Sequence, residues 1–204
     1  MQKRQAVPDP LEHVLKALGR ETGASSDFDL NPDVVLQEGR KLRPAGVLVP
    51  IELRDGAPFV ILTKRASHLK HHPGQIAFPG GKQDEGDTDV IAAALREANE
   101  EIGLPIDNVD VLGTLPFHET VTSFTVTPVL GRVRDTFDIV PEPGEVDEVF
   151  SVPLAHVTDP ARFSVQSRRW MGQRRSYFTV PFGPYYIWGA TARILRGLAE
   201  RMNP

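Results

Sequence analysis

Cysteine is missing from this sequence of 204 residues. Its absence excludes a disulfide framework, a zinc site built from thiolates and catalysis by a thiol nucleophile. A chain without cysteine also fits a reducing compartment, so we expect a cytoplasmic protein.

Long apolar runs and an excess of positive charge are lacking as well. No stretch of about 18 apolar residues occurs, and Lys3 and Arg4 near the start are not followed by an apolar segment. We therefore expect a soluble, unexported protein with no membrane partner. The formal net charge of -4 argues against a nucleic-acid partner, because binding to a phosphate backbone favours a basic face.

The composition is that of an ordinary globular protein, with 40% hydrophobic and 25% charged residues and no internal repeat. The length suits a single domain, whose main body we place at residues 43–204. Residues 1–42 are expected to form an N-terminal helix and a linker packed on it. That helix opens after Pro10 and ends near Gly19, and its apolar residues recur at helical spacing: Leu11, Val14, Leu15 and Leu18.

The middle of the chain reads as β-rich. Residues 45–53 and 59–63 flank a turn-rich break at 54–58 and predict a hairpin, and 75–78 predict a short strand. Further strands are expected at 109–115, 126–133, 146–152, 163–166 and 176–180. Helical patterns predict a central helix, capped by Asp87 or Thr88 and ended after Ile102 by Gly103, and a closing helix over 186–201.

The central helix carries three glutamates at i, i+3 and i+4: Glu97, Glu100 and Glu101. This spacing projects their carboxylates from one face. Like charges so placed destabilise a helix by roughly 0.2–0.5 kcal/mol per pair, and a hard divalent cation such as Mg2+ or Mn2+ would relieve the repulsion. The ordinary alternative is a solvated acidic face.

The residues around these glutamates favour the metal site. Gly80 and Gly81 precede the helix, Arg96 adjoins Glu97, and Gly103 follows the helix. A glycine-shaped turn lets a phosphate chain approach an acidic helix closely. The pattern therefore predicts a metal-assisted phosphoryl or diphosphate site.

This pattern resembles the Nudix hydrolase family, whose box ends in Arg-Glu-apolar-any-Glu-Glu-any-Gly-apolar. Residues 96–104 match this second half fully. In the first half, Asp87 stands where the family has Glu, and eight residues instead of seven separate it from Arg96. The resemblance implies metal binding by Glu97, Glu100 and Glu101, an orienting or phosphate-facing role for Arg96, and a bracing role for the first acidic position.

A second motif narrows the resemblance. Residues 62–81 are similar to the extra signature of the coenzyme A diphosphatase branch, as are the shifted box and residues 43–50 and 187–192. This implies a Nudix α/β/α sandwich with a mixed sheet and additional terminal helices. It also implies metal-dependent hydrolysis of coenzyme A and acyl-CoA to 3',5'-ADP and (acyl-)4'-phosphopantetheine. The substrate-binding residues implied are Arg65, Lys70, His72, Gly80, Gly81 and Lys82.

The cations of this motif suit the substrate, because coenzyme A carries a diphosphate and a separate 3'-phosphate. We expect Arg65, Lys64, Lys70 and Lys82 to gather toward one anionic ligand, with surface solubility as the ordinary alternative. His68, His71 and His72 lie in a loop before Pro73, where helical geometry does not hold, so we expect no metal there.

Several points stay open at this stage. The mechanism needs a proton acceptor, and the candidates are Glu100, Glu101 and the loop carboxylates Glu145 and Glu148, with Glu119 near Ser123 as a further acidic loop. The aromatic residues Phe182, Tyr185, Tyr186 and Trp188 favour core packing over adenine stacking. The rival functions are hydrolysis of a nucleotide sugar or dinucleoside polyphosphate, and an inactive Nudix ligand sensor. Acyl-chain preference and the choice between a monomer and a homodimer are also open.

Overall fold

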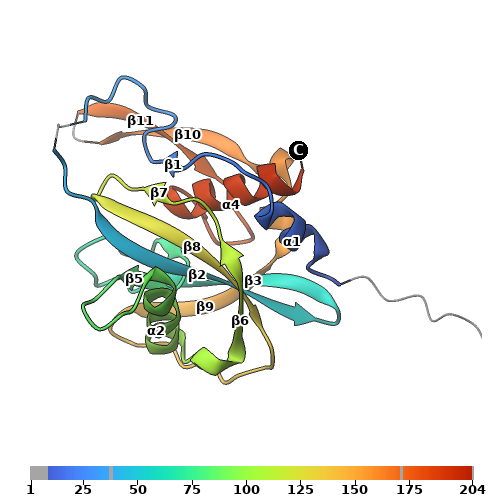
Figure 1. Cartoon of the computed structure of the whole chain (residues 1–204). Helices are drawn as coiled ribbons and strands as arrows, with labels where there is room; N and C mark the ends of the chain where they lie inside the picture. The colour runs from blue at the N-terminus through green and yellow to red at the C-terminus, as the bar shows by residue number, and fades with distance from the viewer. Residues whose placement is uncertain (1–8, 37–38, 171, 204) are drawn as a thin grey trace, which may run out of the picture.

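A computed structural model describes residues 9–36, 39–170 and 172–203 (Figure 1). A mixed sheet contains the strands β1 (Ser25–Ser26), β2 (Arg43–Arg54), β3 (Ala57–Arg65), β4 (Ile76–Ala77), β5 (Gly80–Lys82), β6 (Val109–Thr114), β7 (His118–Glu119), β8 (Phe124–Val133) and β9 (Val146–Pro153). A separate two-stranded ribbon comprises β10 (Ser164–Trp170) and β11 (Gln173–Thr179). The helices are α1 (Glu12–Leu18), α2 (Val90–Ile102), α3 (Leu154–Val157) and α4 (Ala190–Met202), with 3-10 turns at Ile106–Asn108 and Pro160–Arg162.

The long strand β2 lies at the centre of the sheet. It pairs in parallel with β8 and antiparallel with β3 and β5, while β9 extends the sheet beyond β3. The predicted hairpin is confirmed, but its turn is tighter than the expected break. Asp55 and Gly56 have φ angles of 50° and 79°, and positive φ at both central residues matches a two-residue turn to the twist of its strands.

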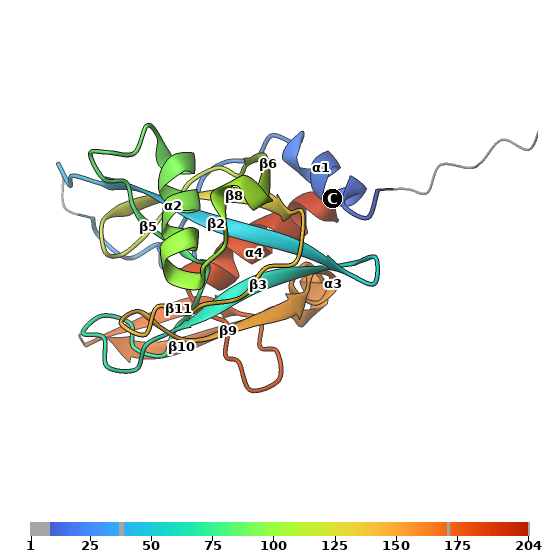
Figure 2. The same ribbon diagram turned by 90° about the horizontal axis from the view of Figure 1, so that it is seen from below.

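Alternation along the central strands divides the interior into two cores. Leu48 and Ile61 point to the face covered by α2, whereas their neighbours Val49 and Leu62 point to the other face. Figures 1 and 2 show α2 on one side of the sheet and α1 and α4 on the other. The predicted α/β/α sandwich with a mixed sheet and terminal helices is therefore the observed architecture.

The N-terminal region contributes to the second of these cores. The predicted first helix is confirmed as α1, and its N-cap residue Leu11 and its buried Val14 share a cluster with Leu195 and Leu198 of α4. Farther along, the fully buried His118 bridges two residues of the N-terminal segment, with Nδ1 3.0 Å from Ser25 Oγ and Nε2 3.1 Å from Asp27 Oδ1. Residues 1–8 and 37–38 of the expected helix and linker lie outside the described residues.

The closing helix is shorter than predicted. It begins at Ala190 instead of residue 186, because the preceding residues turn back on β11 through hydrogen bonds such as Val180 N to Ile187 O. Gly189 then enters the helix with a φ of 66°, which a residue with a side chain rarely adopts. The last two predicted strands are longer than expected and pair with each other. In the part of the chain that the structure describes, no helix is long and apolar enough to cross a membrane.

Candidate active site

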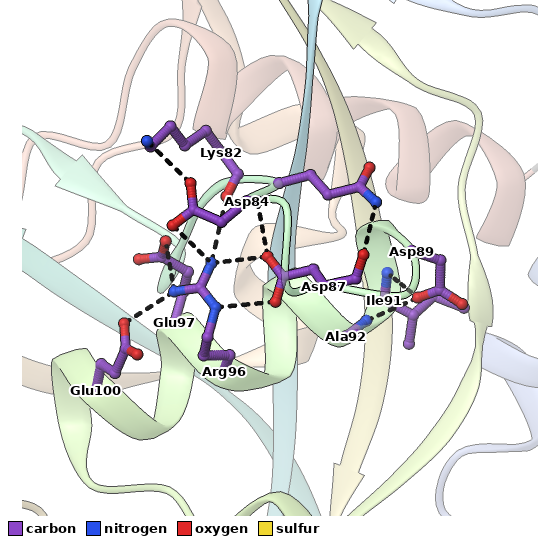
Figure 3. Close-up of polar contacts among 10 residues, drawn as sticks. Lys82, Asp84, Asp87, Asp89, Ile91, Ala92, Arg96, Glu97 and Glu100 are labelled. Atoms are coloured by element: carbon purple, nitrogen blue, oxygen red, sulfur yellow. Dashed lines mark hydrogen bonds and ion pairs between the residues drawn. The ribbon is translucent and has the colours of Figure 1, made fainter.

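Helix α2 is defined by a cap at each end. Asp89, not the predicted Asp87 or Thr88, is the N-cap, and its Oδ1 accepts hydrogen bonds from Ile91 N at 2.9 Å and Ala92 N at 2.8 Å (Figure 3). Gly103 ends the helix as predicted, in the left-handed conformation with φ 73°. The residue that caps the helix, Asp89, is therefore different from Asp87, which holds the first acidic position of the Nudix box.

Three carboxylates converge beside this helix. Oxygen atoms of Glu97, Glu101 and Glu145 all lie within 4.8 Å of one another. Glu97 and Glu101 come from one face of α2, and Glu145 comes from the loop before β9. A hydrogen bond of 2.8 Å from Ala66 N to Glu145 O ties that loop to the end of β3.

Burial raises the pKa values of two carboxyl groups in this acidic group. The Glu101 side chain belongs to a residue that is only 5% exposed, and burial raises its pKa to about 8, although a hydrogen bond from Gly80 N at 3.2 Å works in the opposite direction. Burial also raises the pKa of Glu97. Carboxylates that are buried close to one another are stabilised by a cation, and carboxylate oxygens suit Mg2+ or Mn2+. The donor set therefore fits a divalent cation.

Arg96 binds several carboxylates next to the acidic group, as Figure 3 shows. Its guanidinium binds Asp87 through Nε and Nη2, both at 2.9 Å, and donates through Nη1 to Glu97 at 3.1 Å and Glu100 at 2.9 Å. The Asp87 pKa falls to about 2, because these bonds favour its ionised form. The exposed Glu100 thus lies on Arg96 and outside the close acidic group, and its predicted metal-binding role stays a prediction.

The two glycines before the helix allow a close approach of backbone to carboxylates. A Cβ at Gly81 would overlap the carboxylate of Glu97. At Gly80, which has a φ of 152°, a Cβ would come within 2.5 Å of Gly46 O and 2.6 Å of Val47 Cα. Only glycine lets β5 lie this close to both β2 and the acidic face of α2.

The predicted cations do not all gather at one point. Arg65 lies at the end of β3, where its charge lowers the pKa of both Glu101 and His72, and its buried Nε has no hydrogen-bond partner among the described residues. Lys82 is exposed and forms an ion pair with Asp84 at 2.9 Å. Lys70 and His72, in the loop between β3 and β4, instead line a cavity of about 680 Å³.

The structure also sorts the other acidic and aromatic candidates. Glu119 is paired with Arg40, and Glu148 accepts a hydrogen bond from the Tyr185 hydroxyl, so Glu145 is the loop carboxylate that faces the acidic group. Tyr185 stacks on Phe150 with ring centroids 3.5 Å apart, as core packing predicts. Trp188 instead lines the cavity. The sequence pattern did not distinguish a residue of a cavity wall from one of the core.

Comparison with known proteins agrees with this geometry. The NUDIX domain family model matches residues 42–172. "Uncharacterized Nudix hydrolase NudL" of Enterobacter sp. (strain 638) is 41% identical over 161 residues, which are 79% of this chain and 83% of that protein. The protein of the same name from Escherichia fergusonii is 40% identical over 178 residues, covering 87% and 92%. The NUDIX domain of Shewanella oneidensis NrtR, solved with ADP ribose, shares the fold with a TM-score of 0.50 at 17% identity, over 86% of this chain and 95% of that one.

Proposed function

Because this chain belongs to the Nudix hydrolase family, we propose that it hydrolyses the diphosphate bond of coenzyme A and acyl-CoA. The products are 3',5'-ADP and 4'-phosphopantetheine or its acyl form. The observation that carries the proposal is the position of residues 62–81, the segment similar to the coenzyme A diphosphatase signature. Near its start, Ala66 N donates a hydrogen bond to the backbone oxygen of Glu145. At its end, Gly80 N donates one to the side chain of Glu101, so both ends of the segment contact the acidic group.

Nudix enzymes generally use divalent metal ions, and here Glu97, Glu101 and Glu145 are proposed to hold Mg2+ or Mn2+. Such an ion supplies charge neutralisation of the diphosphate and activation of water. Glu100 belongs to the box as well, but it has to leave Arg96 before it reaches an ion in this group. Arg96 is then a positioning residue, which holds Asp87 and Glu97 in place.

The protein's own groups suit the remaining steps. The Nε of Arg65 is buried and has no hydrogen-bond partner among the described residues, and a guanidinium binds phosphate oxygens through paired hydrogen bonds. Gly80 and Gly81 let β5 lie against β2 and against the Glu97 carboxylate, because neither residue carries a Cβ. Glu145 is the exposed carboxylate of the three and is the proposed acceptor for the proton of the attacking water.

Product analysis tests the proposal directly. The purified chain is incubated with coenzyme A and Mg2+ or Mn2+, and the products are separated by mass spectrometry in parallel with ADP-ribose, a nucleotide sugar and a dinucleoside polyphosphate. We expect 3',5'-ADP and 4'-phosphopantetheine, the highest kcat/KM for coenzyme A or an acyl-CoA, and at least about a hundredfold slower product formation by Glu101→Gln. A higher kcat/KM for another compound would assign a different substrate. Tight binding of coenzyme A without turnover would instead indicate a ligand sensor.

A further inference from the structure

The cavity lined by Lys70 is built from parts of the chain that are far apart in sequence. Its wall contains the loop between β3 and β4, the ribbon β10–β11, the segment after β1 and the beginning of α4. Figure 1 shows the ribbon, this segment and α4 on the face of the sheet opposite α2. A volume of about 680 Å³ is in the range of sites that hold small organic ligands.

The cavity is connected to the acidic group by Arg65. The backbone of Arg65 exchanges hydrogen bonds of 3.0 Å with Gln75 and Gly74, which line the cavity. Its charge acts on Glu101 on one side and on His72 on the other. Arg65 is therefore the residue shared by the surroundings of the acidic group and of the cavity.

The charges in the cavity favour an anion. Lys70 and Arg168 form no ion pair with any carboxylate that the structure describes. Asp27 is the acidic residue of the wall, and its carboxylate is already bonded to His118 and to Val121 N at 2.9 Å. Burial is the main cause that lowers the pKa of His72, and the charges of Arg65 and Arg168 act in the same direction.

An aromatic surface lies beside these cations. The Arg168 guanidinium lies 4.2 Å from the ring centroid of Trp188, and the Tyr177 ring is 5.1 Å from the same indole. Trp188 is only half-buried and contributes to the cavity wall. Nucleobases of every kind stack on indole and guanidinium planes.

We propose that this cavity binds the 3'-phosphorylated adenosine end of the substrate, with Lys70 and Arg168 reading the 3'-phosphate and Trp188 contacting the base. This inference rests on the proposed function and adds the orientation of the substrate. The pantetheine end is uncharged and has no planar ring, so it uses neither the unpaired cations nor the indole. The helix α4, which begins at the cavity wall at Gly189 without a side-chain cap, adds the positive end of its dipole.

A binding experiment tests the cavity apart from catalysis. The full chain, kept metal-free with EDTA, is titrated calorimetrically with 3',5'-ADP, 5'-AMP and 4'-phosphopantetheine. We expect 3',5'-ADP to bind about ten- to a hundredfold more tightly than 5'-AMP, the effect of one charge-assisted phosphate contact. Lys70→Ala and Arg168→Ala should each reduce this ratio. Arg169→Ala is the matched control, because it removes an exposed cation next to Arg168 that does not line the cavity.

Kinetics then separate the roles of the cations. Coenzyme A should exceed dephospho-coenzyme A in kcat/KM about tenfold or more, and Arg168→Ala should narrow this gap because it lowers kcat/KM for coenzyme A more than for dephospho-coenzyme A. Arg65→Ala should instead lower turnover of both compounds equally. Trp188→Leu should weaken the binding of 3',5'-ADP and of 5'-AMP by the same factor, since both contain the base. Circular dichroism checks that the variant is folded.

The outcomes distinguish the two proposals. Equal affinity for 3',5'-ADP and 5'-AMP, or a preference for 4'-phosphopantetheine, would overturn the assignment of the cavity even if coenzyme A is hydrolysed. Selective binding of 3',5'-ADP that depends on Lys70 and Arg168 would support the cavity even if another substrate is hydrolysed faster than coenzyme A.

Discussion

The guanidinium of Arg96 binds the carboxylate of Asp87 through two parallel hydrogen bonds, Nε to Oδ1 and Nη2 to Oδ2, each 2.9 Å long. The pair forms although eight residues separate the two positions, one more than in the Nudix box. The additional residue is absorbed before the helix, because α2 begins only after Asp89. The acidic position of the box therefore keeps its contact with the arginine, and the loop before α2 is braced.

This pair predicts a specific loss of stability in acid. The pKa of Asp87 is lowered from 3.8 to about 2, so its contribution is complete above pH 4 and is lost as the pH falls toward 2. In Asp87→Asn the melting temperature at pH 7 should be lower, and the loss between about pH 4 and 2 should be smaller than in the parent protein. Asp84→Asn, which removes a carboxylate 3.9 Å from Arg96, is the control. Identical acid melting curves for Asp87→Asn and the parent would contradict the assignment.

The acidic group predicts unequal effects for neighbouring glutamates. Glu101→Gln removes a charge from the centre of the proposed metal site and should lower turnover at least about a hundredfold. Glu100→Gln should lower it less, because Glu100 is exposed and bonded to Arg96. Calorimetric titration with Mg2+ or Mn2+ should show that Glu101→Gln binds the metal ion more weakly than Glu100→Gln does. Parent-like turnover in both variants would refute the metal site.

Metal removal should make the stability of the protein depend on pH in the neutral range. Because the pKa of Glu101 is raised from 4.5 to about 8, its favourable contribution is present below pH 4.5 and is lost as the pH rises through 8. Melting temperatures measured in EDTA should fall over this range for the parent and much less for Glu101→Gln. Added Mg2+ should restore the parent at pH 8 by binding the folded state. A parent whose melting temperature is constant from pH 5 to 8 in EDTA would contradict the burial argument.

The close approach of Gly81 to Glu97 predicts a strong effect of a single methyl group. In Gly81→Ala the new Cβ overlaps the Glu97 carboxylate, so that side chain has to leave the acidic group. Turnover and metal affinity should both fall about tenfold or more, which corresponds to about 1.4 kcal/mol. Gly86→Ala is the matched control in the same loop, because a Cβ there meets nothing within 4 Å. Equal kinetics for the two variants would show that Glu97 moves without consequence.

Helix α1 is predicted to be an integral part of the domain. Leu11 is 1% exposed and packs in the core shared with α4, so Leu11→Ala should reduce the free energy of unfolding by roughly 2–5 kcal/mol. Leu15, in α1, is 43% exposed, and Leu15→Ala should change the free energy of unfolding by less than about 1 kcal/mol. Urea unfolding measures both. Similar small losses would mean that α1 is only loosely attached to the domain.

Local patterns in the sequence determined much of the site. The i, i+4 spacing of Glu97 and Glu101 puts both on one helix face in any context, and Gly103 ends the helix because it accepts a left-handed conformation. Hydrophobic periodicity likewise predicted α1, the β2–β3 hairpin and most strands. The helix starts were less certain, since Asp87, Thr88 and Asp89 are all good capping residues in sequence. The structure selects Asp89 because Asp87 is held by Arg96.

Only the tertiary structure decided which distant residues join the site. Glu145 reaches Glu101 because β9 pairs with β3 and places Val146 opposite Arg65, a register that no local spacing encodes. For the same reason the motif cations divide between the acidic group and the cavity, where Lys70 meets Arg168 and Trp188 from the ribbon and the approach to α4. Side-chain charge and helical spacing are properties of a short segment. Burial and strand pairing depend on the whole sheet, and here they complete the acidic group and form the cavity.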